Sequence, residues 1–181
     1  MIVTIDAGHS GPVEPGACAG GVCECNVTLG IALQLAALIR EDGHTVYLLR
    51  ESDIDDTDTD GLAWRANASN DAGSDAYLCI HANSAANEAA RGTEVYCYPG
   101  SEDGHTLADC IRCRMVAALG TVDRGTKEAN FEVLRLTAAP AVLIETAFLS
   151  NPDDRALLLP SHYYAIAAAI KQGFADWAGV Q

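Results

Sequence analysis

Short apolar runs alternate with regularly spaced apolar positions along the chain. Runs rich in apolar and β-branched residues predict strands over residues 2–5, 45–49, 76–80, 93–98, 132–136 and 141–145. Apolar residues at intervals of three and four predict helices that include residues 31–39, 62–70, 107–118 and 166–177. This alternation predicts an α/β fold with a mostly parallel twisted sheet and helices on both faces.

The segments between these elements are polar or rich in glycine. Residues 10–23 are rich in Gly, Pro and Ala and are expected to form a loop. Asn26 is then expected to cap the first long helix, and Gly43 to end it. The acidic run 52–60 is expected to be a solvated loop without a catalytic role, although neighbouring carboxylates could also hold calcium.

Length and composition favour one domain. The chain has 181 residues, of which 49% are apolar, so it can bury one core and is short for two; residues 1–181 are expected to form a single domain. The longest apolar stretch, residues 29–39, is shorter than the roughly 20 residues that span a membrane, so no membrane span is expected. The first strand is preceded by neither a basic region nor a long apolar segment, and we expect no signal peptide in this chain.

Charge and cysteine content narrow the possible classes of protein. The net charge of −14 disfavours a surface that binds polyanions, so no nucleic-acid partner is expected. There are seven cysteines, an odd number without regular spacing, and this pattern predicts reduced thiols rather than a disulfide framework.

Four side chains could together form a metal-dependent site. His9, His81 and Glu145 lie at or just after the carboxyl ends of three predicted strands, where parallel sheets bind ligands. Glu24 lies near the predicted start of the first helix, where the helix dipole favours a carboxylate. Each has an ordinary structural explanation by itself, but two histidines and a carboxylate are also a ligand set of catalytic zinc.

The residues around these positions form recognisable segments. The main segments are Ile5-Asp6-Ala7-Gly8-His9, Gly21-Val22-Cys23-Glu24-Cys25-Asn26, Ile80-His81-Ala82-Asn83-Ser84 and Leu143-Ile144-Glu145-Thr146-Ala147-Phe148-Leu149-Ser150-Asn151. Weaker matches are Arg65-Ala66-Asn67, Asp123-Arg124-Gly125 and Val133-Leu134-Arg135. In order and rough spacing, these segments resemble those of the zinc-dependent N-acetylmuramoyl-L-alanine amidases of the type 3 family, found in bacterial autolysins and phage endolysins. The resemblance extends over essentially the whole chain.

The resemblance implies a zinc hydrolase and assigns roles by position. His9, Glu24 and His81 would hold one zinc ion, and Glu145 would be the catalytic glutamate; it identifies no substrate-binding residues. The implied substrate is peptidoglycan, cut at the amide between the lactyl group of N-acetylmuramic acid and L-alanine. Zinc would polarise the scissile carbonyl and lower the pKa of water to about 7, while Glu145 would pass a proton to the leaving amine.

Two features depart from the pattern of that family. Ala7 stands where proline is usual, which should loosen the following turn slightly without removing a ligand. Cys23 and Cys25 flank Glu24, and because thiolates bind zinc well, an alternative or oxidised coordination stays open. We also expect Asp6 to orient His9, as carboxylates often do behind metal-binding histidines.

Other interpretations compete with the zinc hydrolase. Cys79 and His81 are two residues apart on one strand, as a cysteine hydrolase could use them, but Cys79 is expected to be a buried core residue. The spacing of Cys110 and Cys113 could suggest a redox or zinc motif, and we interpret it as helix packing. A zinc peptidase that cuts within the stem peptide and a non-catalytic peptidoglycan-binding module are the alternative functions.

The expected setting is the cell wall. We expect a monomer that is made in the cytoplasm and reaches peptidoglycan by endolysin-like release, or by secretion if the sequence is truncated. The net charge of −14 disfavours electrostatic adhesion to anionic wall polymers.

Overall fold

Strands and helices alternate along the chain, and the computed structural model describes residues 1–53 and 61–179. The strands of the central sheet are β1 (Ile2–Ala7), β4 (Thr45–Leu48), β5 (Ala76–Asn83), β6 (Thr93–Cys97), β7 (Asp123–Glu128) and β8 (Ala141–Phe148). A small separate sheet contains β2 (Cys18–Ala19) and β3 (Val22–Cys23). The helices are α1 (Glu24–Glu41), α2 (Leu62–Asp71), α3 (Glu102–Leu119), α4 (Glu132–Leu136), α5 (Pro152–Leu157) and α6 (Tyr163–Ala178), with a 3-10 turn at Pro160–His162.

The central sheet is mostly parallel. Its strands are arranged in the order β4-β1-β5-β8-β6-β7. The first four of these are parallel to one another, whereas β6 runs antiparallel to β8 and parallel to β7. The predicted fold class, a single α/β domain with a mostly parallel sheet, is therefore confirmed.

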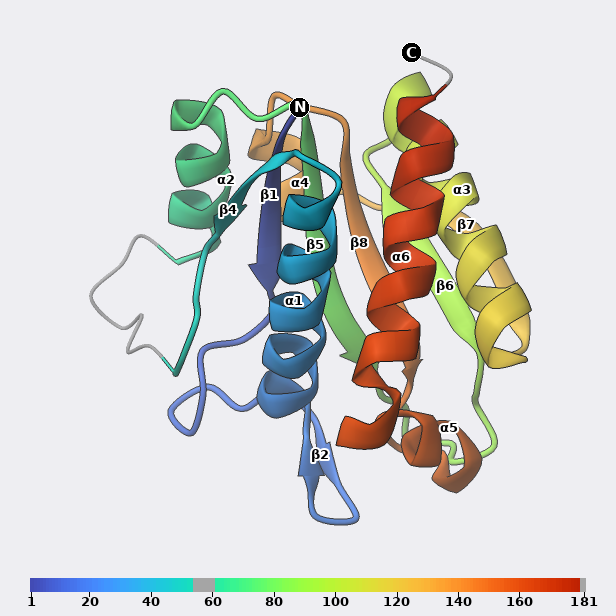
Figure 1. Ribbon diagram of the computed structural model, residues 1–181. Helices are drawn as coiled ribbons and strands as arrows, with labels where there is room; N and C mark the ends of the chain where they lie inside the picture. The colour runs from blue at the N-terminus through green and yellow to red at the C-terminus, as the bar shows by residue number, and fades with distance from the viewer. Residues whose placement is uncertain (54–60, 180–181) are drawn as a thin grey trace.

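Helices cover both faces of this sheet, as predicted (Figure 1). Helices α1, α3 and α6 pack on one face over the larger apolar core, which takes in alternate residues of the central strands such as Val3, Ile5, Leu78 and Ile80. Helices α2 and α4 lie on the opposite face, where a smaller cluster includes Tyr77, Cys79 and Leu143. Because successive strand residues point to opposite faces, Cys79 and His81 share the face that carries the smaller cluster.

Several predicted elements differ from the structure. Residues 132–136 form the short helix α4 rather than a strand. The prediction failed because the periodicity of a five-residue run cannot distinguish a helix from a strand. Strand β7 was not predicted, since this edge strand, Asp-Arg-Gly-Thr-Lys-Glu, contains no apolar residue. Residues 10–23 are not all loop, because they include β2 and β3.

The start of α1 also differs from the prediction. The helix begins at Glu24 with Cys23 as its N-cap, and Asn26 is an exposed residue inside the first turn. This places Glu24 at the very end of the helix, next to the loop from β1.

Two further expectations concern the acidic run and the absence of a membrane span. The acidic run 52–60 lies mostly outside the described residues; Ser52 and Asp53 are exposed. Among the described helices, none combines the length and apolar character required to cross a membrane.

Candidate metal and catalytic site

Three side chains that can bind metal meet at one end of the sheet. His9 follows β1, Glu24 begins α1, and His81 lies within β5. The Glu24 carboxylate lies 2.9 Å from His9 Nε2 through one oxygen and 2.9 Å from His81 Nδ1 through the other. One ligand atom from each residue lies within 4.8 Å of the others, so the predicted convergence of these three residues is present.

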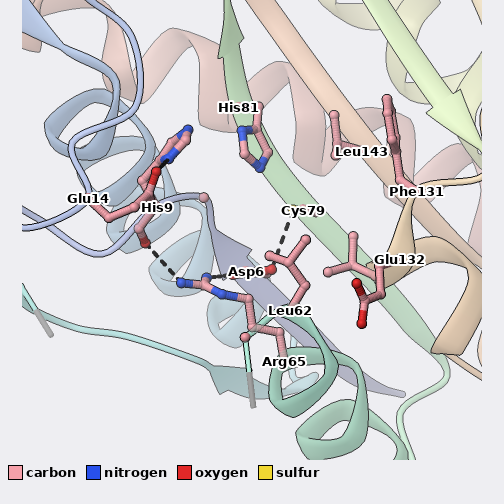
Figure 2. Close-up of a pocket in the computed structure, with 13 residues that line it drawn as sticks. Asp6, His9, Glu14, Leu62, Arg65, Cys79, His81, Phe131, Glu132 and Leu143 are labelled. Atoms are coloured by element: carbon pink, nitrogen blue, oxygen red, sulfur yellow. Dashed lines mark hydrogen bonds and ion pairs between the residues drawn. The ribbon is translucent and has the colours of Figure 1, made fainter. Parts of the chain in front are cut away.

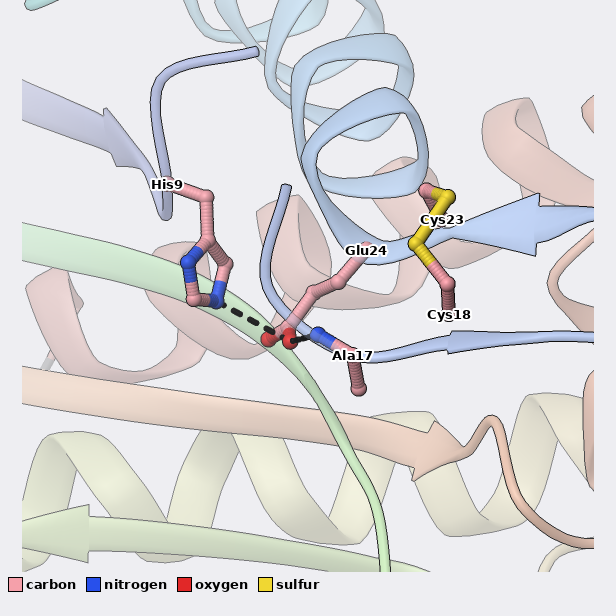
Figure 3. The surroundings of a disulfide bond; sticks show 5 residues. All are labelled: His9, Ala17, Cys18, Cys23 and Glu24. Atoms are coloured by element: carbon pink, nitrogen blue, oxygen red, sulfur yellow. Dashed lines mark hydrogen bonds and ion pairs between the residues drawn. A yellow bond between two sulfur atoms is a disulfide. The ribbon is translucent and has the colours of Figure 1, made fainter. Parts of the chain in front are cut away.

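The Glu24 carboxylate is buried, and both of its oxygens have hydrogen-bond partners. It also accepts hydrogen bonds from the backbone N–H group of Ala82, at 2.9 Å, and from that of Ala17, at 3.0 Å, the second of which Figure 3 shows. Burial by itself would raise the pKa of Glu24, but the hydrogen bonds from His81 and His9 hold it well below its ordinary value. The carboxylate is therefore charged at neutral pH, which a metal ligand requires.

Two glycines allow the backbone to approach these side chains closely. A Cβ atom on Gly8 would lie 2.5 Å from the His81 ring, and one on Gly16 would lie 2.5 Å from the His9 ring. A set of two imidazoles and one carboxylate, packed this closely, suits a divalent ion with three protein ligands and an open position.

Buried arginines hold the turn that carries His9. The backbone of His9 has a φ of 66°, an uncommon conformation for a residue other than glycine. Arg65 donates to the carbonyl of His9 at 3.0 Å, and Arg50 donates to the carbonyls of Ala7 and Gly8, each at 3.0 Å. The role of Arg50 was missed, because a single arginine after a predicted strand gives no signal of what it contacts.

The prediction that Asp6 orients His9 is wrong. Asp6 binds Arg65 and accepts hydrogen bonds from the Tyr77 hydroxyl, at 2.5 Å, and the Cys79 thiol, at 3.4 Å. These contacts anchor β1 to α2 and β5 instead, and Figure 2 shows Asp6 between Arg65 and Cys79.

Glu14 contacts His9 in place of Asp6. Its carboxylate lies 2.6 Å from His9 Nδ1, on the ring nitrogen opposite the one that faces Glu24 (Figure 2). Burial lowers the pKa of His9, but the carboxylates of Glu24 and Glu14 outweigh it and raise that pKa overall. Glu14 was not singled out, because it lies in a glycine- and proline-rich segment whose path the sequence does not define.

Glu145 lies beside His81 on the neighbouring strand. The two residues are register partners of β5 and β8, so their side chains project from the same face. Both lie within their strands rather than at the ends, because β5 and β8 extend further than predicted. Burial raises the pKa of Glu145 to about 7, and among the described residues no donor contacts its Oε2 atom.

A cavity of about 490 Å³ opens next to the two histidines. Its walls include the apolar side chains of Leu62, Phe131, Val133 and Leu143, and Figure 2 shows Phe131 and Leu143 beyond His81. Such a mixture of apolar walls and a few polar groups is typical of a site for a small organic ligand.

Cys79 is a buried core residue, as predicted. It is 1% exposed, and burial together with the nearby carboxylate of Asp6 raises the pKa of its thiol well above the ordinary value. A thiol in this state is a poor nucleophile, which disfavours the cysteine hydrolase.

The prediction of reduced thiols is wrong for one pair. Cys18 and Cys23 form a disulfide across the antiparallel strands β2 and β3, with their Cα atoms 4.1 Å apart (Figure 3). Sequence spacing could not show that the chain turns back at the glycines between them. Among the described residues, the group that could hold a metal contains no cysteine, and Cys25 is buried.

Helix packing explains only one cysteine of α3. Cys110 is half-buried against the larger core, as interpreted, whereas Cys113 is exposed.

The comparisons with known proteins agree with this architecture. The profile of the N-acetylmuramoyl-L-alanine amidase family matches residues 3–176. The chain is 36% identical to an N-acetylmuramoyl-L-alanine amidase of Bacillus licheniformis over 96% of its length, and 37% identical to a sporulation-specific N-acetylmuramoyl-L-alanine amidase of Bacillus subtilis over 89%. It covers 66% and 61% of those two relatives. A solved N-acetylmuramoyl-L-alanine amidase of Nostoc punctiforme superposes with a TM-score of 0.91 at 31% identity, covering 99% of this chain and 97% of the other.

The disulfide is expected to stabilise the fold. Replacing both Cys18 and Cys23 by serine should lower the free energy of unfolding by about 2 kcal/mol, because the bond closes a short loop in the unfolded chain. Denaturant unfolding measures this, with Cys113→Ser, at an exposed cysteine outside the bond, as the control. Equal stability of the double variant and the control would contradict the prediction.

The raised pKa of Glu145 predicts a pH-dependent cost to stability in the metal-free protein. The folded state binds the Glu145 proton more tightly than the unfolded chain, since the pKa rises from 4.5 to about 7. The stability that this carboxyl contributes is therefore greatest below pH 4.5 and is lost as the pH rises through 7. We subtract the unfolding free energy of Glu145→Gln from that of the wild type at each pH. This difference should be lower at pH 8 than at pH 5. A difference in unfolding free energy that is independent of pH would contradict this.

Proposed function

The chain belongs to the type 3 family of N-acetylmuramoyl-L-alanine amidases, and we propose that it hydrolyses the amide between the lactyl group of N-acetylmuramic acid and L-alanine in peptidoglycan. The single observation that supports this best is the position of Glu145, a carboxyl group of raised pKa next to a group of three metal-binding side chains. The chain spans about two thirds of the length of the first two curated relatives, so the activity of a longer protein is part of the proposal.

His9, Glu24 and His81 would hold one zinc ion, in line with their chemistry and spacing. Zinc supplies Lewis-acid chemistry: it polarises a carbonyl oxygen and makes water more acidic. Glu14 would hold the His9 ring, because its carboxylate contacts the nitrogen that does not face Glu24.

Glu145 would serve as the general base. A carboxyl group with a pKa of about 7 can both take and release a proton near neutral pH, which is the range in which general bases work best. Its Oε2 atom, without a donor among the described residues, would take the proton from water and pass it to the amine of L-alanine. The apolar walls of the adjacent cavity would exclude water from the other parts of the bound substrate.

The place of action is the cell wall. We propose a monomer, since one chain provides all the side chains of the site, and endolysin-like release or secretion as its route to the wall. Neither the stem peptidase nor the non-catalytic module is favoured by an observation in the structure.

Digestion of purified peptidoglycan tests this function. The zinc-loaded protein should generate new L-alanine amino termini, identified by mass spectrometry, and Glu145→Gln should reduce their rate of formation about 10²- to 10⁴-fold because the base is lost. Glu102→Gln, at an exposed position on α3, is the control. New termini inside the stem peptide would favour the peptidase, and the absence of any cleavage would favour the binding module.

Removal of a ligand should lower the zinc content. His81→Ala leaves two protein ligands, so the purified variant should contain much less than one zinc per chain by elemental analysis, whereas Glu145→Gln should contain the same amount as the wild type. His105→Ala, at an exposed histidine on α3, should keep its zinc. A full zinc content in His81→Ala would remove His81 from the ligand set.

A further inference from the structure

A second buried carboxylate lies next to Glu145. Strand β6 runs antiparallel to β8, and Glu94 of β6 is the register partner of Glu145. Because register partners project from the same face, His81, Glu145 and Glu94 form a row across three neighbouring strands. Glu94 is only 2% exposed, so its charge must be compensated by nearby groups.

Four donors surround Glu94. They are the amide of Asn83 at 2.8 Å, the hydroxyl of Tyr96 at 2.7 Å, Nε of Arg124 at 2.6 Å, and the ammonium group of Lys127. Burial would raise the pKa of Glu94, but the hydrogen bonds from Lys127, Arg124 and Tyr96 lower it to about 2. One carboxylate therefore faces two cations, and the cluster carries a net charge of +1.

The two cations also reach solvent. The side chains of Arg124 and Lys127 are 33% and 36% exposed, whereas that of Glu94 is 3% exposed. The Arg124 guanidinium lies over the Phe148 ring, 4.8 Å from its centre, and the Lys127 nitrogen lies 5.6 Å from the centre of the Tyr96 ring. Glu94 and these rings fix both cations in place, so little conformational entropy remains to be lost when they bind an anion.

The cation cluster adjoins the cavity of the proposed active site. The Tyr96 ring packs edge-on against Phe131, with centroids 5.2 Å apart, and Phe131 lines the cavity. Tyr96 is also the register partner of Leu143, another residue of the cavity wall. A substrate held at Glu145 could therefore extend to Lys127 along one face of the sheet.

We propose that Lys127 and Arg124, held by Glu94, form a subsite for a carboxylate of the peptidoglycan stem peptide, close to the L-alanine whose amide bond is cut. The inference rests on the proposed function. A fixed excess of positive charge next to the site contrasts with the rest of a chain that has 25 acidic and 11 basic residues. Ammonium and guanidinium groups bind carboxylates through charge-assisted hydrogen bonds, and a carboxamide in the same place would lose that charge.

Two synthetic muramoyl tripeptides test the subsite. They are identical except that the residue after L-alanine carries either a free α-carboxylate or its carboxamide. The zinc-loaded wild type should cleave the carboxylate substrate with a kcat/KM at least tenfold higher. Lys127→Gln should reduce this preference to less than threefold, because KM for the carboxylate substrate should rise more than KM for the carboxamide. Lys127→Arg should restore the preference.

The control is another half-buried lysine that forms an ion pair. Lys171→Gln removes a cation of α6 that pairs with Asp42, and it should keep the wild-type preference. Thermal unfolding of each variant shows whether it is folded, and the wild-type comparison tests the proposal even if Lys127→Gln does not fold.

Several outcomes would overturn the subsite. One is an equal kcat/KM of the wild type for the two tripeptides. Another is an equal loss of kcat/KM for both tripeptides in Lys127→Gln, because Lys127 would then only neutralise Glu94. Cleavage of intact peptidoglycan without cleavage of either tripeptide would show that the local carboxylate does not direct recognition. If zinc-dependent cleavage at L-alanine is seen in any of these cases, the proposed function still stands. If neither peptidoglycan nor the tripeptides are cleaved there, both the proposed function and the subsite are wrong.

Discussion

The site depends on the buried carboxylate of Glu24, which joins three separate segments of the chain. It contacts His9 from the loop after β1, His81 from the middle of β5, and the N–H group of Ala17. A buried charge is tolerated only when all its hydrogen bonds are made, so each segment must be placed within a few tenths of an ångström. Gly16 meets this requirement because it lies against the His9 ring, where a side chain would collide, and a disulfide closes the hairpin that ends immediately before Glu24.

The register of the sheet then places different chemistry on neighbouring strands. His81, Glu145 and Glu94 lie in one row, with a candidate metal ligand at one end and a carboxylate bound by cations at the other. The carboxyls of Glu24 and Glu94 have lowered pKa values because donors surround them, whereas burial keeps the pKa of Glu145 near 7. These three carboxyl groups can therefore serve three purposes, because their surroundings rather than their residue type set their protonation.

The sequence predicted the layers of the fold and the residues that meet, because both follow from periodicity and from the resemblance of whole segments. It could not predict contacts that depend on the path of a loop. Asp6 is closer to His9 in sequence than Glu14 is, yet the alternation of side chains along β1 directs Asp6 toward Arg65, and the loop after β1 brings Glu14 to the ring. The disulfide depends on a hairpin of two-residue strands, too short to give a pattern, and β7 has a polar sequence because it lies at the edge of the sheet.

The overall charge limits how such a domain can recognise its substrate. A net charge of −14 repels anionic polymers at long range, so electrostatic steering toward them is weak. Attraction to an anion must then act at short range, because physiological salt screens charges beyond about 8 Å. Lys127 and Arg124 meet this condition because Glu94 and two aromatic rings hold them at fixed positions next to Glu145. In the proposed subsite, affinity of this kind would be directed at a small group near the reacting bond, so it would select the peptide to be cut without holding the protein on the bulk of the wall.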